Sequence, residues 1–417
     1  MKEEKTCYIK RRKNMCEIIF EKNRLSKLQT PCYIFDLNIL TESLNNIKSY
    51  IAQNHITYSM KANPFLVDDI KDKVGKIEVC SLGELEICIS KNILPTDIMI
   101  AGINKPEEYL VAAIQYGVKN FIIESRFQWE NLKRVCSLYH AGNVQAFIRV
   151  NIGNQFGMSI SEAKFLTESN DDIISISGIH IYMGTQNFDI RKVNSHIQVL
   201  KKYMEEIAKS TYFFFRKIII GCGAPVEYYR DAKDECSDIW PKMVDIFSHE
   251  FPGYDIEYEL GRKIVASCGK YITKVMEKKI VNEKTYIIVD GGTHQLNYYN
   301  QMYGRRIPFI TQHPEREGEE RYTICGSLCS ASDILVFEGY LNTILADDIL
   351  CFENAGAYTV TEGAYLFLSH PLPAIYRLSM NGRLTKIREP IKISHINGGY
   401  NDEKRKDSGE NNKYYDC

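Results

Sequence analysis

Short apolar runs alternate with longer stretches of helical periodicity through the first two thirds of the chain. The apolar runs are typical of strands, and apolar residues three or four positions apart are typical of helices. Eight strands are predicted, at residues 56–60, 77–80, 97–100, 119–123, 145–150, 174–183, 216–220 and 255–259. Helices are predicted between them, at residues 67–73, 83–90, 106–116, 126–139, 160–168, 190–209 and 238–249. Successive strand–helix units of this kind predict an eight-stranded parallel β/α barrel, TIM-like in architecture.

The pattern changes after residue 270, where strand-like runs follow one another without long helices between them. These runs cover residues 284–290, 321–325, 334–337, 349–353 and 374–379. We therefore expect a C-terminal β-rich domain over 271–396, beside a barrel domain over 28–270. Residues 1–27, with a strand-like run at 16–20, are expected to join the β domain, and the polar residues 397–417 are expected to form a disordered tail.

Composition and charge limit the function classes. The 417 residues are 44% hydrophobic and 25% charged, which is typical of a globular protein, and the net charge of −1 gives no basic field for nucleic acid. No apolar run approaches the ~20 residues of a membrane span, and no signal peptide is evident. We expect a cytoplasmic protein that binds neither nucleic acid nor membrane, whose 13 cysteines are reduced and form no metal site.

Candidate chemistry begins at Lys61, which ends an apolar run and is followed by Ala62-Asn63-Pro64. Asn-Pro stops a strand, so Lys61 is predicted at the C-terminal mouth of the first barrel strand, where such barrels carry their chemistry. A lysine amine there can attack a carbonyl group or hold an aldehyde cofactor as a Schiff base. Taken alone, however, the residue indicates only a solvated lysine at a strand end.

Two later strand ends carry groups that suit a flat, anionic ligand. Gly221-Cys222-Gly223 follows the seventh strand, where these barrels often bind phosphate, although a short Gly-x-Gly is by itself only a turn. At the eighth strand, Glu259 and Arg262 could pair with a protonated ring nitrogen and with a phosphate, or simply with each other. On the sixth strand, His180 and Tyr182 share one face, and Gly184-Thr185 at its end could donate to a phosphate.

Seven motifs carry a resemblance to a known enzyme family. They are Tyr58–Asn63, Glu78–Glu84, Gly178–Gln186, Gly221–Gly223, Glu259–Arg262, Gly326–Asp333 and Glu353–Tyr358. In this order and spacing the chain resembles the fold-type III pyridoxal-phosphate decarboxylases, the group of the diaminopimelate and ornithine decarboxylases, from about Thr30 to Tyr376. The resemblance implies pyridoxal 5'-phosphate as the cofactor, a barrel of the alanine-racemase type and a homodimer.

The resemblance also implies roles for single residues. Lys61 would hold the cofactor aldehyde, and Glu259 would keep the pyridine nitrogen protonated. The residues implied around the phosphate are Thr185, Gly221, Cys222, Gly223, Arg262 and Tyr358. Cys329 would reach the site from the second subunit, and either Cys329 or the released Lys61 would return a proton to the substrate α-carbon after CO2 is lost.

Three positions depart from the family pattern. The histidine stacked on the cofactor ring is replaced by Tyr182, while His180 lies two residues earlier on the same strand face, so either side chain could meet the ring. The acidic residue after the active-site cysteine is replaced by Ser330, and Asp333 matches a family position of its own. Residues Phe367–Pro373 resemble the branch that acts in siderophore and antibiotic assembly, such as the butirosin-pathway decarboxylase, or form a rebuilt loop without bearing on the substrate.

We therefore predict a pyridoxal-phosphate-dependent decarboxylase of specialised metabolism. Its substrate would be an amino acid or an amino-acid conjugate, including a carrier-protein-bound or siderophore intermediate, and Ser330 and Asp333 would lie beside it. The alternatives are a decarboxylase of diaminopimelate or another basic amino acid, an amino-acid racemase, and a non-catalytic binding protein of the same fold. Glu259 favours decarboxylation over racemisation, because a protonated ring is the stronger electron acceptor.

Overall fold

The structure is a computed structural model that describes residues 28–168, 172–230, 239–301 and 303–398. These residues divide into two compact units. The barrel unit comprises residues 36–270 and 353–361. The described part of the β unit comprises residues 28–35, 271–352 and 362–398.

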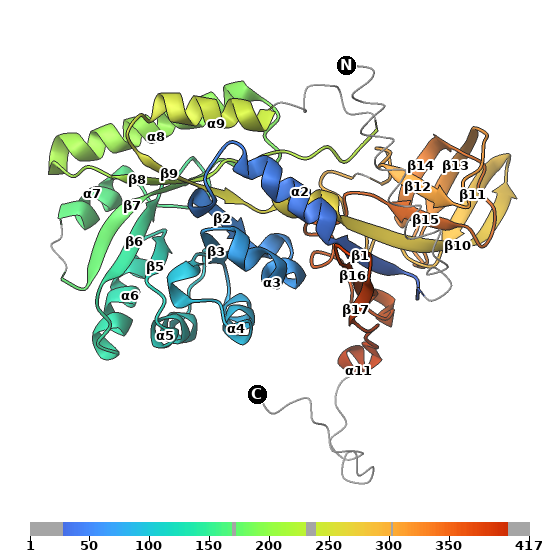
Figure 1. The fold of residues 1–417 in the computed structure, drawn as a ribbon, viewed down its shortest axis with the longest axis horizontal. Helices are drawn as coiled ribbons and strands as arrows, with labels where there is room; N and C mark the ends of the chain where they lie inside the picture. The colour runs from blue at the N-terminus through green and yellow to red at the C-terminus, as the bar shows by residue number, and fades with distance from the viewer. Residues whose placement is uncertain (1–27, 169–171, 231–238, 302, 399–417) are drawn as a thin grey trace, which may run out of the picture. The chain divides into compact units, whose positions relative to one another are not determined.

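Eight parallel strands close the barrel unit, each paired with its neighbours in chain order (Figure 1). They are β2 (Ile56–Ser59), β3 (Lys76–Val79), β4 (Ile98–Ile100), β5 (Asn120–Ile123), β6 (Val144–Arg149), β7 (Ile174–Tyr182), β8 (Lys217–Gly221) and β9 (Asp255–Leu260). The barrel closes where β9 returns to β2, with Leu260 opposite Tyr58. The predicted fold class is therefore confirmed, since all eight predicted strands are present.

Helices lie around the barrel strands (Figure 1). They are α2 (Leu37–Lys48), α3 (Val67–Ile70), α4 (Leu82–Ser90), α5 (Glu107–Tyr116), α6 (Arg126–Leu138), α7 (Ile160–Glu168), α8 (Ile190–Thr211), α9 (Ile239–Glu250) and α10 (Arg262–Val265). Two of these helices begin with a serine N-cap: the Ser81 and Ser125 hydroxyls accept hydrogen bonds from backbone N–H groups in the first turns of α4 and α6. In α8 the buried residues recur at helical spacing, among them Val193, Ile197 and Leu200.

The β unit is built on a nine-stranded sheet. Seven of its strands follow the order β14-β13-β11-β10-β1-β16-β17, and the other two are β15, which pairs with β10, and β12, which pairs with β15. The strands are β1 (Cys32–Asp36), β10 (Gly269–Val281), β11 (Lys284–Val289), β12 (Ile310–His313), β13 (Glu320–Cys325), β14 (Ile334–Leu341), β15 (Ile349–Phe352), β16 (Ala374–Leu378) and β17 (Leu384–Arg388), and a short helix, α11 (Ser394–Asn397), follows them. One core cluster joins Cys32, Ile34, Ile272, Cys351 and Tyr376. The predicted C-terminal β-rich domain is therefore present.

The grouping of residues differs from the predicted domain boundaries at two places. Residues 28–35 group with the β unit, because β1 lies between β10 and β16 in its sheet. Residues 353–361 group with the barrel, because the N–H of Tyr358 donates to the Ala62 carbonyl at 2.7 Å. The strand-like run at 16–20 and the tail beyond residue 398 lie outside the described residues.

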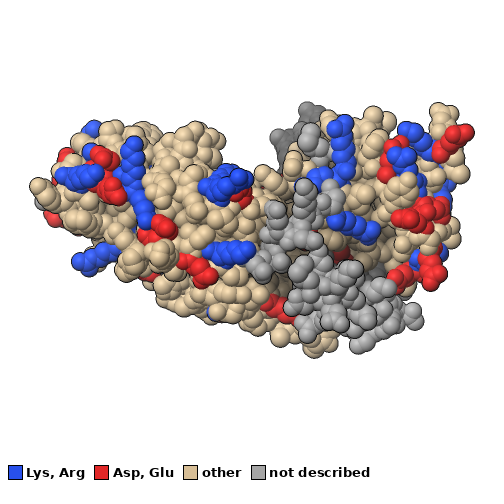
Figure 2. All heavy atoms as spheres, turned by 90° about the horizontal axis from the view of Figure 1, so that it is seen from above, with Lys and Arg blue, Asp and Glu red and all other residues tan. Residues whose placement is uncertain are grey.

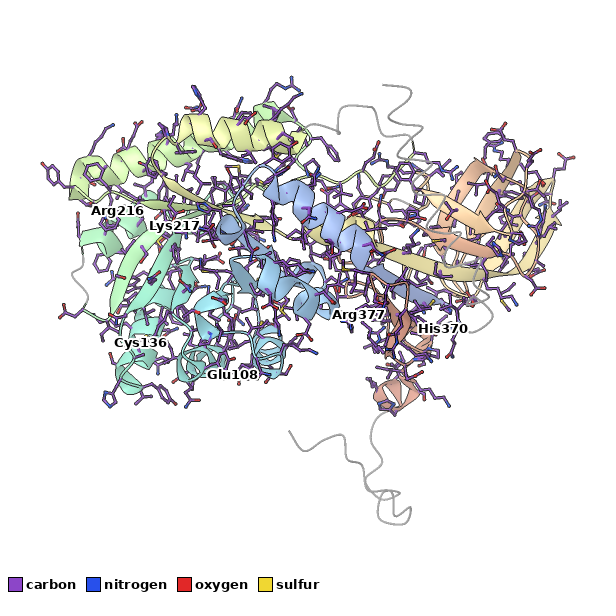
Figure 3. The ribbon with its side chains drawn as sticks, in the orientation of Figure 1. Glu108, Cys136, Arg216, Lys217, His370 and Arg377 are labelled. Carbon is purple, nitrogen blue, oxygen red and sulfur yellow. The ribbon has the colours of Figure 1, made fainter. Side chains whose placement is uncertain are left out.

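A charged layer lies at the N-terminal end of the barrel strands. The buried Glu257 carboxylate on β9 accepts from Lys76 Nζ at 2.9 Å and from Lys217 Nζ at 2.7 Å. Lys217 begins β8 (Figure 3), and the Thr57 hydroxyl on β2 also donates to Glu257. Burial raises the pKa of Glu257, but the two lysines outweigh it and leave that pKa below its ordinary value. This layer joins four neighbouring strands and leaves the opposite end of the barrel for chemistry.

The surface carries both signs of charge. On the face shown in Figure 2, basic and acidic side chains lie among one another and between wide areas without charge. Of the helices in the described ranges, none has the length and apolar character needed to cross a bilayer.

Candidate active site

Lys61 lies immediately after β2, in a short 3-10 turn formed by Met60–Ala62. Asn63 follows this turn and caps the next one: its side-chain oxygen accepts from Phe65 N at 3.1 Å, and its side-chain amide donates to the Gly356 carbonyl at 2.9 Å. The predicted position of Lys61, at the C-terminal end of a barrel strand, is therefore correct. The returning segment 353–361 fixes the turn that carries it.

The Lys61 ammonium is held by a neighbouring carboxylate. Its Nζ donates to both oxygens of Glu78, on β3, at 2.7 Å each, and lies 3.6 Å from Cys80 Sγ. Burial by itself lowers the pKa of Lys61, but Glu78, with contributions from Cys80 and Glu259, raises it well above its ordinary value. An amine in this state is a cation at neutral pH, and it must lose its proton before it can act as a nucleophile.

Glu259 is the second-last residue of β9 and is buried with a histidine beside it. His180 Nε2, on β7, lies 2.9 Å from Glu259 Oε2, and the two side chains are 3% and 5% exposed. Glu259 Oε1 is also buried and has no hydrogen-bond partner among the described residues. The carboxylate is therefore held by one oxygen and offers the other to a ligand.

Gly221, at the end of β8, leaves a narrow space between two site residues. A Cβ atom at this position would lie 2.7 Å from Tyr182 Cδ2 and 3.2 Å from Glu259 Oε2. Tyr182 and Glu259 thus face one another across a position where only glycine fits. Burial raises the pKa of Tyr182, so its phenol stays neutral at physiological pH.

The loops after β7 and β8 are joined by amide side chains. Asn187 Nδ2 donates to the Met183 carbonyl at 3.0 Å and to the Cys222 carbonyl at 2.8 Å. Gly223 has φ +65°, and a Cβ atom there would lie only 2.3 Å from the Gly184 carbonyl oxygen. These contacts hold two glycine-containing loops side by side, with Thr185 within the first of them, and such loops can present backbone N–H groups to an anion.

Arg262 begins α10 and is surrounded by two tyrosines. Its Nη1 donates to the Tyr228 hydroxyl at 2.7 Å, and its Cζ lies 4.5 Å from the centre of the Tyr358 ring. Burial raises the pKa of Tyr358 to about 12, and the nearby charges of Lys61 and Arg262 act against that rise. The barrel unit thus brings Arg262 and Tyr358 to the same end as Lys61.

The Arg149 guanidinium lies near the Tyr182 ring. Arg149, at the end of β6, donates to Glu124 Oε1 at 2.9 Å. Its Cζ lies 4.5 Å from the Phe156 ring centre and 5.6 Å from the Tyr182 ring centre. The guanidinium therefore lies against two aromatic rings, and Glu124 fixes it.

Several of these residues were not assigned roles from the sequence. Four of them contact a predicted site residue or its loop, namely Glu78, Asn187, Tyr228 and Arg149. Glu78 and Arg149 do carry a signal, since each is a charged residue within a predicted, largely apolar strand. The parallel register that places Glu78 beside Ser59, and so beside Lys61, cannot be read from one strand alone.

The donor set fits pyridoxal phosphate. A buried carboxylate oxygen without a donor suits a protonated ring nitrogen, and Lys61 suits an aldehyde. The loops at Gly184 and Gly223, together with the Arg262 guanidinium, suit a phosphate. Burial raises the pKa of the Cys222 thiol to about 12, so this residue would meet a phosphate with its backbone and not as a thiolate.

The predicted residues after β13 lie in the β unit. Cys329 is exposed, and the Ser330 hydroxyl lies 2.8 Å from that of Ser332. Asp333 is 2% exposed, and its carboxylate accepts from Thr293 N at 2.7 Å and from Leu328 N at 2.8 Å. These contacts make Asp333 a support of the Cys329 loop, and its contact with substrate stays a prediction.

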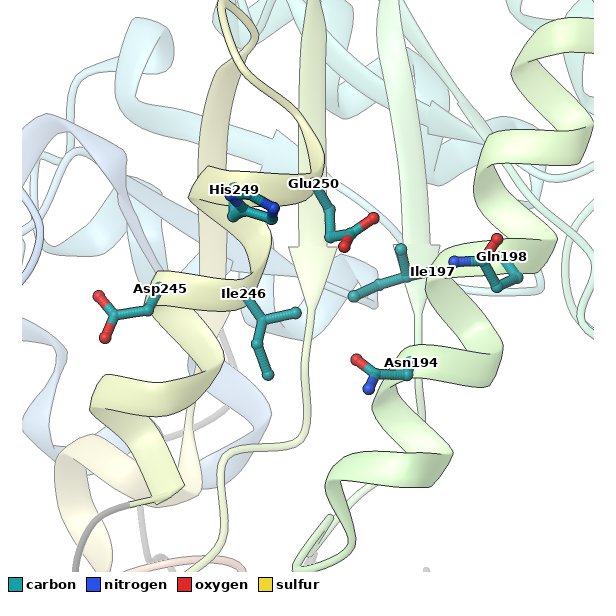
Figure 4. A pocket seen from close by; sticks show the side chains of 7 residues that line it. All are labelled: Asn194, Ile197, Gln198, Asp245, Ile246, His249 and Glu250. Carbon is teal, nitrogen blue, oxygen red and sulfur yellow. The ribbon is translucent and has the colours of Figure 1, made fainter.

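A groove of about 380 Å³ lies on the outside of the barrel, between α8 and α9 (Figure 4). It is lined by Asn194, Ile197, Gln198, Asp245, Ile246, His249 and Glu250. None of the predicted site residues lines it, so the groove is distinct from the residues around Lys61.

Known proteins resemble this chain over most of its length. The 2-[(L-alanin-3-ylcarbamoyl)methyl]-2-hydroxybutanedioate decarboxylase of Staphylococcus aureus is 28% identical, over 83% of this chain and 94% of that protein. The L-glutamyl-[BtrI acyl-carrier protein] decarboxylase of Niallia circulans is 26% identical, over 87% and 91%. The crystal structure of diaminopimelate decarboxylase from Helicobacter pylori complexed with L-lysine has the same fold, with a TM-score of 0.78 at 19% identity over 90% of this chain and 97% of that one.

The family described as pyridoxal-dependent decarboxylase, pyridoxal binding domain, matches residues 37–266. That segment is more than half of the chain and carries Lys61, Glu259 and Arg262. The predicted family, enzyme class and cofactor are therefore confirmed: this chain belongs to the pyridoxal-dependent decarboxylases and uses pyridoxal phosphate to remove CO2 from amino-acid substrates.

Proposed function

We propose that this enzyme decarboxylates an α-amino acid whose distal end is joined to another group through an amide, ester or thioester link, in a pathway of specialised metabolism. A distal amine on the substrate would carry a positive charge, which needs a carboxylate when it is removed from water. A distal end in such a link carries no such charge, and neutral hydroxyl groups can donate to its carbonyl oxygen.

The observation that carries this proposal is the chemistry of the Cys329 loop. Within residues 326–333 the only acid is Asp333, and its two oxygens accept from Thr293 and Leu328. The position after Cys329 is Ser330, whose hydroxyl pairs with Ser332. The loop therefore presents hydroxyl groups and no uncommitted carboxylate, which suits an amide, ester or thioester oxygen better than an ammonium group.

The two relatives support the same substrate class. One acts on an alanin-3-yl group joined through a carbamoyl link to a hydroxybutanedioate, and the other acts on a glutamyl group bound to an acyl-carrier protein. Both names describe an amino acid joined to a larger group, and in the first of them the link is at carbon 3 of alanine, away from the α-carbon. A conjugate with a small acid and a conjugate with a carrier protein are thus the first two candidates.

The roles of the chain's residues follow from the site. Bound pyridoxal phosphate supplies an aldehyde for the substrate amine and a ring that accepts the electron pair left by CO2. Glu259 would hold the ring nitrogen, the loops at Gly184 and Gly223 with Arg262 would bind the phosphate, and Tyr182 would face the ring. Either Lys61 or Cys329 would then deliver a proton to the α-carbon.

We further propose that the enzyme is a homodimer in the cytoplasm. The exposed position of Cys329 supports the first proposal, because a residue that serves the partner subunit's site must be accessible to it. Size measurement of the purified protein and fractionation of the source cells test the two proposals separately.

The substrate proposal is tested by a mass-spectrometric decarboxylation assay on the cofactor-loaded protein. The panel contains free diaminopimelate, lysine, ornithine and arginine beside citrate-conjugated and carrier-bound amino acids. We expect loss of CO2 from a conjugate and little from the free basic amino acids. Rapid turnover of free diaminopimelate or ornithine would contradict the substrate class and leave the family assignment intact.

A further inference from the structure

We infer that His180 is a positioning residue for Glu259: it binds one carboxylate oxygen and thereby reserves the other for the ring nitrogen of the cofactor. The inference rests on the proposed role of Glu259 at that nitrogen. It assigns to His180 a function behind the carboxylate and leaves Tyr182 as the residue that faces the cofactor ring.

The geometry of the pair is the first argument. His180 on β7 and Glu259 on β9 are separated by β8, and their side chains meet inside the barrel with Nε2 and Oε2 2.9 Å apart. Both side chains are at least nine-tenths buried. A buried contact of this length between an imidazole and a carboxylate is a charge-assisted hydrogen bond, and it fixes the rotation of the carboxylate.

The unshared atoms of the pair are the second argument. Glu259 Oε1 and His180 Nδ1 are both buried, and neither has a hydrogen-bond partner within the described ranges. An ionised carboxylate cannot donate, so Nε2 carries the hydrogen of the contact. In a neutral imidazole Nδ1 then holds only a lone pair, whereas a histidinium would bury a second N–H without an acceptor. In this arrangement Glu259 carries a negative charge and His180 is neutral. Glu259 Oε1 then accepts no hydrogen bond from the described residues.

The surroundings of the pair are the third argument. Gly221 on β8 has no side chain, and a Cβ atom there would lie 3.2 Å from Glu259 Oε2 and 2.7 Å from Tyr182 Cδ2. The strand between His180 and Glu259 therefore cannot supply another side chain to hold Oε2. Without His180 this oxygen would lose its donor, and a buried carboxylate without donors is stabilised by taking up a proton, which would remove the charge that the ring nitrogen needs.

Variants at position 180 test the inference with readouts other than activity. His180→Leu and His180→Phe remove the donor, while His180→Gln keeps an N–H group near the position of Nε2. We expect the two apolar variants to weaken pyridoxal phosphate binding to the cofactor-free protein by about ten- to hundredfold, the effect of losing one charge-assisted hydrogen bond. Nitrogen-15 NMR of cofactor labelled at its ring nitrogen should show loss of the ring proton in these variants and its retention in His180→Gln.

Two controls separate the possible failures. His196→Leu removes a half-buried histidine on α8, outside the site, and should leave affinity and ring protonation unchanged. Glu259→Gln should remove the ring proton by itself: if it does not, the proposed role of Glu259 fails. If it does while the apolar variants at 180 keep wild-type affinity and a protonated ring, only the role of His180 is overturned.

The wild-type protein provides a check that does not depend on folding of the variants. Nitrogen-15 labelling of the histidines should show His180 protonated at Nε2 and unprotonated at Nδ1. A doubly protonated ring, or a hydrogen at Nδ1 alone, would contradict the inferred arrangement.

Discussion

At the scale of single residues, Lys61 and Glu78 form an ion pair at the proposed cofactor site. The two oxygens of Glu78 lie 2.7 Å from Lys61 Nζ, and this contact outweighs the effect of burial on the amine. A lysine that must attack an aldehyde has to lose its proton first. The same carboxylate that keeps Lys61 charged in the free protein can receive the amine again each time it is released.

Replacement of Glu78 should make Lys61 reactive at lower pH. In Glu78→Gln the largest contribution that raises the pKa of Lys61 is lost while burial, which lowers it, remains, so this pKa should fall. The measurement is the initial rate at which pyridoxal phosphate becomes covalently bound to cofactor-free protein, followed by absorbance across pH. The exposed Glu86→Gln on α4 is the matched control. An unchanged pH midpoint in Glu78→Gln would refute the assignment.

The position of a single residue could be predicted from the sequence where it depends only on the neighbouring residues in the chain. The position of Lys61 follows from an apolar run stopped by Asn63-Pro64, and such effects act within a few residues. The neighbours of a site residue depend instead on strands far apart in the chain, as in the contact of His180 with Glu259 across β8. The sequence therefore left open which of His180 and Tyr182 faces the cofactor.

At the scale of elements, the charged layer around Glu257 links neighbouring strands at the N-terminal end of the barrel. The substitution Glu257→Gln would leave Lys76 and Lys217 without the buried carboxylate that they contact. Both lysines remain 17–21% exposed, so we expect a loss of about 1–3 kcal/mol of stability, less than for a fully buried pair. Thermal unfolding should show a lower midpoint in Glu257→Gln, and the surface control Glu108→Gln on α5 (Figure 3) should not.

This effect has a defined pH dependence. The pKa of Glu257 lies below its ordinary value in the folded protein, so its contribution is complete above the unfolded value of about 4.3 and is lost as pH falls through the folded value. The difference in unfolding midpoint between wild type and Glu257→Gln should therefore persist from pH 7 to about pH 5 and shrink below about pH 4. A difference that stays constant into that acid range would contradict the role of the carboxylate charge.

Most elements could be predicted because their periodicity is local. The eight barrel strands and the helices between them follow from apolar spacing, and α8 shows this clearly. The sheet position of β1 could not be predicted in this way, because a five-residue apolar strand fits equally well at the start of a barrel or within another sheet. Pairing with β10 and β16, more than 200 positions later, decides it.

At the scale of the whole molecule, the proposed dimer makes each active site the product of two chains. Lys61→Ala removes the amine and Cys329→Ala removes the thiol, so each variant alone should lose most of its activity. If Cys329 serves the partner subunit's site, dissociated and mixed variants should form hybrid dimers in which one of the two sites has both groups.

The measurement is decarboxylase activity before and after mixing, with each variant mixed with itself as the control. Recovery of part of the wild-type activity in the hybrid sample alone is the expected result. Complete absence of recovery, with hybrid dimers shown to be present, would place Cys329 and Lys61 of one chain in the same site.

The return of residues 353–361 to the barrel has a consequence for how the enzyme can be made and divided. Tyr358 and Gly356 contact Ala62 and Asn63, so the turn that carries Lys61 is finished by residues almost 300 positions away. A ribosome that has produced the eight barrel strands has therefore not yet supplied a finished cofactor site. For the same reason we expect the matched family segment at 37–266, produced alone, to lack part of its cofactor site, because the contacting residues 353–361 follow the β-unit residues 271–352 in the chain.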